Sequence, residues 1–146
     1  MAMRTFTLQE AQTLLPVIDS LLQRALAAKG KAEVMDLQMR ALQQRILMTG
    51  GMFVDITAVA RSRAEREAAV QQAHDALSEI DSIGVQVKDI NTGLLDFPCN
   101  LDGNIVLLCW KMGEKEITHW HTLEGGFAAR QPLDDRFRGS RRERPN

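Results

Sequence analysis

Two stretches in the last third of the chain decide the fold: GVQVKDINTGLLDFP over 84–98 and IVLLCWKMGEKEITHWHTLEGGFAARQPL over 105–133. Both contain short runs of β-branched, apolar and aromatic residues separated by turn residues such as Asn91-Thr92-Gly93. This pattern predicts four strands, at 85–90, 94–97, 105–110 and 117–123. Because every connection is short, we expect the strands to form an antiparallel meander.

The first two thirds of the chain have the periodicity of helices. Thr7 and Glu10 have the spacing of a capping box, which predicts a helix from about residue 8. Pro16 lies inside this pattern, so we expect a break or kink near Leu15. Apolar residues then recur in alternating steps of four and three, as along one seam of a coiled coil: Leu14, Ile18, Leu21, Ala25, Ala28, Ala32, Met35, Met39, Leu42 and Ile46.

A second apolar seam follows Gly50-Gly51, a pair that predicts a helix end and a turn. It consists of Ile56, Val59, Val70, Ala73, Leu77 and Ile80. Folding the chain at the glycines makes 17–82 an antiparallel hairpin, with larger side chains of the second seam opposite the alanines of the first. Arg63 and Arg66 interrupt the second seam, and we expect them either to reach into solvent at the tip or to pair with acids of a second subunit.

The expected fold class is therefore α+β, with a long, coiled-coil-like helical hairpin packed on a small four-stranded antiparallel sheet. A length of 146 residues fits a single domain over 1–146. Its parts are the hairpin (1–83), the sheet (84–124), and a loop with an Arg-rich tail (125–146). A seam of this length, rich in alanine and methionine, favours self-association, so we expect a homodimer.

Composition narrows the class of protein. The net charge of −1, and aromatic residues limited to two Trp and five Phe, argue against a nucleic-acid-binding protein. The Arg-rich tail leaves contact with RNA as an alternative. Cys99 and Cys109 form no disulfide framework. Since no stretch resembles a signal peptide or reaches transmembrane length, we expect a cytoplasmic protein without membrane contact.

Alternation along the strands sorts their side chains onto two faces. If the strands pair around their predicted turns, one face is apolar and is expected to lie on the helices. The other face is mixed: Lys88, Ile90, Leu94, Asp96, Val106, Leu108, Trp110, Ile117, His119 and His121. A mixed face with an exposed tryptophan is typical of an interface or a ligand surface. Its expected polar and aromatic anchors are Lys88, Asp96, Trp110 and His121, joined by Arg130 of the following loop.

A metal site is the alternative use of this face. His119 and His121 point to the same side of one strand, an arrangement common in half of a transition-metal site. Glu124 is the nearest third ligand, whereas we expect Asp96 about 10 Å from His121, two strands away. Without a metal, the histidines pack beside Trp110 or line an interface, and no cofactor is expected. The sequence contains no P-loop, dinucleotide-binding or nucleophile-elbow motif, which argues against the enzymes that use them.

GVQVKDINTGLLDFP, LCWKMGE, Trp120-His121 and GFAARQPL together resemble an uncharacterised prokaryotic family, domain of unknown function 2203. FTLQEAQTLLP near the N-terminus resembles the usual opening of that family. The resemblance covers nearly the whole chain and implies no reaction, because the family has no assigned activity. The matching positions are Gly84, Val87, Lys88, Asp89, Gly93, Asp96, Phe97, Pro98, Trp110, Gly113, Trp120, His121, Gly126, Phe127 and Arg130.

The sequence therefore favours a non-enzymatic, homo-oligomeric binding or assembly module. Its recognition surface would be the mixed sheet face with the loop over 125–132, and its partner an unknown protein or small molecule. The first alternative is a divalent-metal-binding protein or metal-dependent enzyme that uses His119, His121 and Glu124. The second is a protein that contacts RNA through its Arg-rich tail.

Overall fold

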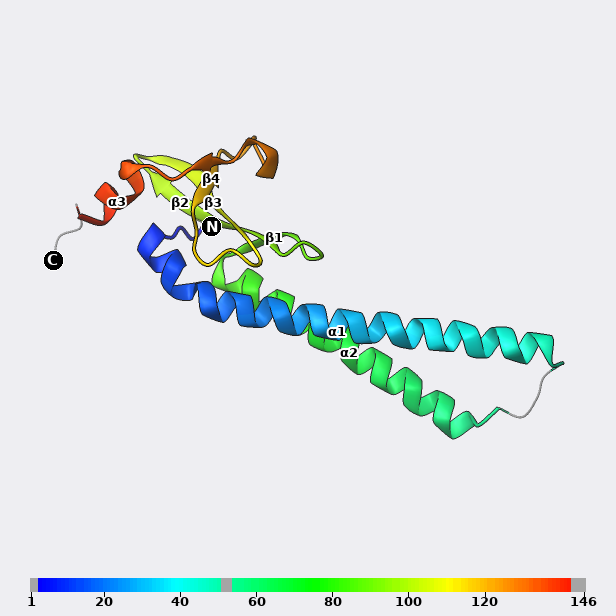
Figure 1. The fold of residues 1–146 in the computed structure, drawn as a ribbon. Coiled ribbons are helices and arrows are strands. Elements are labelled where there is room, and N and C mark those ends of the chain that lie inside the picture. The colour runs from blue at the N-terminus through cyan, green and yellow to red at the C-terminus, as the bar shows by residue number, and fades with distance from the viewer. Residues whose placement is uncertain (1–2, 51–53, 143–146) are drawn as a thin grey trace. The chain divides into compact units, whose positions relative to one another are not determined.

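The computed structural model describes residues 3–50 and 54–142, with side chains as far as residue 138. The chain forms two compact units, one made of the N-terminal residues through Leu22 with the chain from Ser78 onward, the other of Gln23–Leu77. None of the helices in the described ranges is long and apolar enough to cross a membrane. The fold is α+β, as expected (Figure 1), with these elements: α1 (Leu8–Met48), α2 (Ile56–Ile83), β1 (Gln86–Asp89), β2 (Leu94–Leu101), β3 (Asn104–Lys111), β4 (His119–His121), the 3-10 helix η1 (Phe127–Ala129), β5 (Gln131–Pro132) and α3 (Asp135–Arg142).

Helix α1 begins with the predicted capping box. The Thr7 amide donates to Glu10 Oε1 at 2.9 Å, and the Glu10 amide donates to Thr7 Oγ1 at 3.1 Å. Of the break or kink expected near Leu15, the break is wrong, because α1 continues through Pro16 as one helix. A proline inside a helix removes one backbone hydrogen bond. Here Leu15 and Ile18 are buried next to it, and the packing of this helix face outweighs that loss.

The unit Gln23–Leu77 is a helical hairpin (Figure 1). Its core is smaller than expected. Every buried residue among its described positions is an alanine: Ala25, Ala28, Ala32, Ala69 and Ala76. Val70, expected to pack opposite the alanines of α1, is instead 43% exposed. The buried residues of α2 in this unit, Ala69 and Ala76, each lie one residue before the predicted seam positions Val70 and Leu77.

Arg66 is exposed, as one of the two expectations has it, and its acidic partner lies in the same chain. It forms an ion pair with Asp36 of α1, within the same chain and the same unit. Both side chains are more than a third exposed, so solvent screens the pair and its contribution to stability is small. It nevertheless joins α1 to α2 within one hairpin, beyond the alanine core.

The sheet has five antiparallel strands in sequence order, not the expected four. The additional strand, β5, pairs with β4 through His119 with Pro132 and Trp120 with Gln131. Two residues are too few to show a strand pattern in the sequence, which is why β5 escaped prediction. Strand β2 is also longer than expected, because Pro98 lies inside it and its carbonyl accepts from the Phe6 amide at 2.7 Å.

The turn between β2 and β3 sets the register of the sheet. Asp102 and Gly103 have φ values of 53° and 88°, as the two central residues of a tight Asp-Gly hairpin turn require. Leu101 therefore pairs with Asn104, and Asp96 pairs with Cys109. The faces expected along β3 are wrong by one residue, because the predicted strands at 94–97 and 105–110 leave a longer connection than the two-residue turn that the structure has.

This register leaves one apolar face and one face that carries the polar residues. Phe97 pairs with Leu108, which pairs with Trp120, and all three are buried. Phe6 packs edge-on against Phe97, with ring centroids 5.8 Å apart. Asp96 points to the opposite face, since successive residues of a strand alternate.

Candidate metal centre

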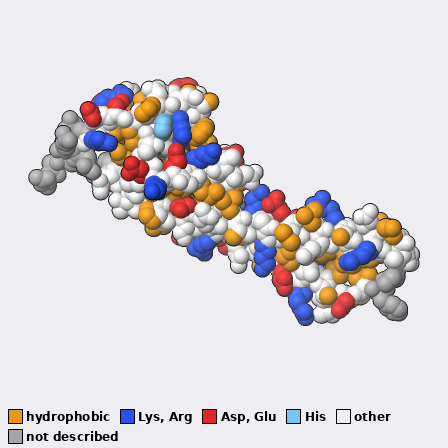
Figure 2. Space-filling view, in the orientation of Figure 1, with side chains coloured by type: hydrophobic (Ala, Val, Ile, Leu, Met, Phe, Trp, Pro, Cys, Tyr) orange, Lys and Arg blue, Asp and Glu red, His pale blue; other side chains and the backbone are white. Residues whose placement is uncertain are grey.

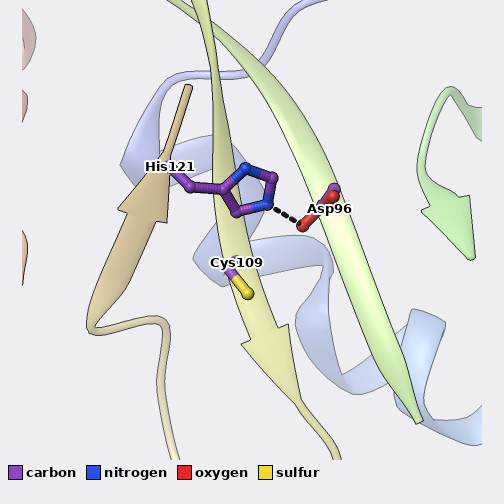
Figure 3. A group of neighbouring side chains, drawn as sticks. All are labelled: Asp96, Cys109 and His121. Atoms are coloured by element: carbon purple, nitrogen blue, oxygen red, sulfur yellow. Dashed lines mark hydrogen bonds and ion pairs between the residues drawn. The ribbon is translucent and has the colours of Figure 1, made fainter. Parts of the chain in front are cut away.

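Three buried side chains from three adjacent strands meet on the polar face of the sheet (Figure 3). Asp96 of β2 and Cys109 of β3 are direct cross-strand partners. His119 of β4 is the next partner of Cys109, and His121 lies two residues further along the same face. One possible ligand atom from each of Asp96, Cys109 and His121 lies within 4.8 Å of the other two.

The imidazole of His121 is held by both of its nitrogens. Nδ1 lies 2.7 Å from the carbonyl oxygen of Thr122, and Nε2 lies 3.0 Å from Asp96 Oδ1. A carbonyl oxygen only accepts hydrogen bonds, so Nδ1 carries a hydrogen and Nε2 faces the carboxyl group. Metal-binding histidines usually have this arrangement, in which one ring N–H donates to a carbonyl and the other nitrogen is free to coordinate.

A hydrogen bond joins Asp96 and His121 at this contact. Burial raises the pKa of Asp96, while the neighbouring His121 and the charge of Lys88 act in the opposite direction. An ionised carboxylate facing an unprotonated Nε2 would set two lone pairs against each other. A proton therefore lies between the two atoms, and the pair as a whole is neutral.

Cys109 is a protonated thiol at neutral pH. Burial raises its pKa to about 11, the charge of Asp96 acts in the same direction, and a hydrogen bond with Arg130 acts against both. A thiol with so high a pKa is a poor nucleophile, because the reactive form is the thiolate. A bound divalent cation changes this, since coordination removes the thiol proton outright.

The loop that follows β4 lies against Cys109. Arg130 Nη1 lies 3.2 Å from Glu114 Oε2, and both side chains are mostly buried. The Arg130 guanidinium also stacks over the ring of Phe127 at 4.3 Å from its centroid. The backbone carbonyl of Glu114 accepts a hydrogen bond from Trp110 Nε1 at 2.9 Å. This bond connects Glu114, the ion-pair partner of Arg130, to a side chain on the opposite face of β3. Arg130 thus places a fixed cation beside the thiol.

The ligand set expected from the sequence does not assemble. His119 is half-buried and its Nδ1 lies 2.8 Å from Thr118 Oγ1, outside the cluster. Glu124 is exposed and lines a separate hollow with Trp120. The distance of about 10 Å expected between Asp96 and His121 is wrong, because their side chains are hydrogen-bonded. Cys109 is missing from the expected mixed face, because the faces predicted for β3 are wrong by one residue.

The five expected anchors do not form an exposed recognition surface. Asp96 and His121 are buried in the cluster, Arg130 reaches it from the loop, and Trp110 is 2% exposed on the other face. Lys88 acts on Asp96 only through its charge. The residue opposite Asp96 is Gln86, because the pairing of β1 with β2 is irregular between Val87 and Asp89.

The described part of the Arg-rich tail also forms no basic surface for nucleic acid. Arg136 is bound to Asp134 at 2.8 Å, and its guanidinium lies 5.4 Å from the ring centroid of Trp120. Arg138 is exposed on α3. The side chains of Arg141, Arg142 and Arg144, on which the RNA alternative depends, lie outside the described residues.

A family model for an uncharacterized conserved protein (DUF2203) matches residues 4–133. The chain belongs to this family. The three clustered residues and Arg130 all lie within the DUF2203 part of the chain. Comparison with curated proteins and with solved structures finds no match. The family description gives no activity, so the function has to follow from the site itself.

Proposed function

We propose that this protein binds one divalent transition-metal ion, with zinc as the leading candidate, through Asp96, Cys109 and His121. The observation that carries the proposal is the convergence of a carboxylate oxygen, a thiol sulfur and an imidazole nitrogen in one buried cluster. Zinc coordinates all three kinds of atom. The hydrogen bond from His121 Nδ1 to Thr122 leaves Nε2 as the coordinating nitrogen.

Charge balance supports a divalent ion. Without a metal, the cluster is neutral and holds two exchangeable protons, one shared by Asp96 and His121 and one on the Cys109 thiol. With both protons removed, the carboxylate and the thiolate together carry two negative charges, which a divalent cation neutralises. The ion therefore replaces two protons without leaving a net charge in a buried site, where an unpaired charge costs several kcal/mol.

The positions of the donor atoms need only small adjustments. Tetrahedral zinc, with bonds to nitrogen and oxygen near 2.0–2.1 Å, holds such atoms about 3.4 Å apart. His121 Nε2 and Asp96 Oδ1 are now 3.0 Å apart, so they would separate slightly. The sulfur, now within 4.8 Å of both atoms, would approach to about 3.6 Å from each of them.

Three protein ligands leave one position open on a tetrahedral ion. Structural zinc sites normally have four protein ligands, whereas sites with three keep a water or a substrate in the fourth position. Arg130 lies beside Cys109 and would favour an anionic or carbonyl oxygen there.

Elemental analysis of untagged protein, purified without chelator and then incubated with zinc, tests the proposal. We expect about one ion per chain in the wild type and almost none in His121→Ala. His119→Ala is the matched control, because it removes an imidazole from the same strand outside the cluster and should keep the metal. Absence of metal from the wild type, or equal metal in both variants, would contradict it.

A further inference from the structure

The hairpin unit exposes large apolar side chains away from its alanine core. None of the described residues of 36–50 and 54–68 is buried. Leu47, Met48 and Ile56 are 82%, 79% and 80% exposed, and Leu37 is 61% exposed. Figure 2 shows hydrophobic side chains of this hairpin at the surface between charged ones. Large apolar side chains gathered at one end of a hairpin are typical of a surface that a partner covers.

A groove between α1 and α2 runs through the same region. Its volume is about 290 Å³, and its apolar lining consists of Met35, Met39, Leu42, Val54, Ala58 and Val59. Methionine side chains are flexible and adapt to the surface of a partner. The groove also carries one cation and one anion, Arg45 and Asp55.

We propose that a second copy of this chain covers the groove, so that two hairpins form a homodimer with a four-helix interface. In a two-fold symmetric dimer the same surface meets itself. Arg45 of one copy then approaches Asp55 of the other, and the reverse contact forms at the symmetry-related position. Asp55 is fixed for this role, because its Oδ1 accepts from the Ala58 amide at 3.0 Å and caps α2.

Both signs of charge in the groove favour a second copy over a lipid surface. Helices that bind membranes combine an apolar face with a predominantly basic polar face. Here Asp55 lines the groove itself, and Glu67 lines the adjoining hollow with Met35 and Arg63. All of these residues belong to Gln23–Leu77, so the inference does not depend on the metal centre.

Sedimentation equilibrium of the full chain tests the location of the interface. We expect a wild-type dimer at micromolar concentration, and a dimer Kd raised at least about 100-fold by the double variant Leu47→Glu/Ile56→Glu. Val17→Glu/Leu123→Glu is the matched control, because it changes two apolar residues that are 51% and 55% exposed in the other unit. A monomeric wild type, even one that binds anionic vesicles, would overturn the proposal. So would a dimer that survives in the Leu47/Ile56 variant while circular dichroism shows both variants folded.

A charge exchange tests the symmetry. Arg45→Asp and Asp55→Arg each place like charges across the two-fold axis, so each variant alone should be mainly monomeric. Mixed in equal amounts, the two should form a one-to-one heterodimer, because opposite charges then meet at both contacts. A pair within one chain could not be restored by mixing, so a mixture that stays monomeric contradicts the two-fold arrangement.

Discussion

Asp96 and His121 are the two buried polar residues of the described chain, at 1% and 3% exposure, and each is the hydrogen-bond partner of the other. A buried polar group without a partner costs about 1–3 kcal/mol. Removing one of the two side chains therefore leaves the other unsatisfied and lowers stability as well as metal affinity. For this reason, every metal measurement on such a variant needs a parallel check that the variant is folded.

Cys99 gives a residue-scale prediction that does not involve metal. Burial, with a smaller effect from the charge of Glu10, raises its pKa to about 11 from an ordinary value of 9.0. The unfolded chain releases the thiol proton first, so stability is full below about pH 9 and falls as the pH rises to about 11. The expected loss is about 2–3 kcal/mol per buried thiol.

Urea unfolding at pH 8, 10 and 11 under reducing conditions measures this loss. Cys109, whose pKa is also raised to about 11, contributes in the same direction. Cys99→Ala should therefore show a smaller alkaline loss than the wild type, although it is less stable at pH 8. An identical pH dependence in the two proteins would mean that the Cys99 thiol is not protected in the folded state.

Among the elements, the β2–β3 hairpin matters most, because it brings Asp96 opposite Cys109. Gly103 has φ of 88°, where an L side chain is strained, and a Cβ there would meet open space. Gly103→Ala should therefore lower stability by about 1–2 kcal/mol through backbone strain alone. Gly30 lies inside α1 with open space around it, so Gly30→Ala should raise stability by about 0.5–1 kcal/mol.

Thermal or urea unfolding of these two variants measures whether each substitution lowers or raises the free energy of unfolding. The pair is matched, because both substitutions add a single methyl group that meets no neighbouring atom. Opposite signs would confirm that backbone conformation, and not packing, decides the effect of the added methyl group at each site. A neutral Gly103→Ala would remove that explanation.

At the scale of the whole molecule, local signals in the sequence were sufficient for the α+β class, the capped start of α1 and the antiparallel order of β1 to β4. Features decided by tertiary contact were not predictable. Side-chain packing stabilises α1 as a continuous helix over Pro16. The two-residue strand β5 is defined only by its pairing with β4. The prediction of the candidate site was wrong for a narrower reason. The predicted connection between β2 and β3 is longer than the observed turn, so Cys109 was not expected on the face of Asp96.

Two of the three clustered residues, Asp96 and His121, were nevertheless expected on one face of the sheet. The third ligand could have been found from the Asp102-Gly103 turn, whose preference for a two-residue loop fixes the pairing of every residue in β2 and β3. His119 was favoured instead because spacing within one strand is visible in a sequence. Contacts between strands depend on register, and an error of one residue in the register assigns every side chain of the strand to the opposite face.

Titration with Co²⁺, followed by absorption spectroscopy, tests the metal centre most directly. We predict saturation at about one equivalent, with tetrahedral d–d bands and a thiolate-to-cobalt charge-transfer band that reports the sulfur ligand. The charge-transfer band should be absent in Cys109→Ser and retained in Cys99→Ser, which alters the other buried thiol outside the cluster. A wild-type protein that shows no charge-transfer band, or a band that survives in Cys109→Ser, would contradict the assignment of Asp96, Cys109 and His121 as a metal site.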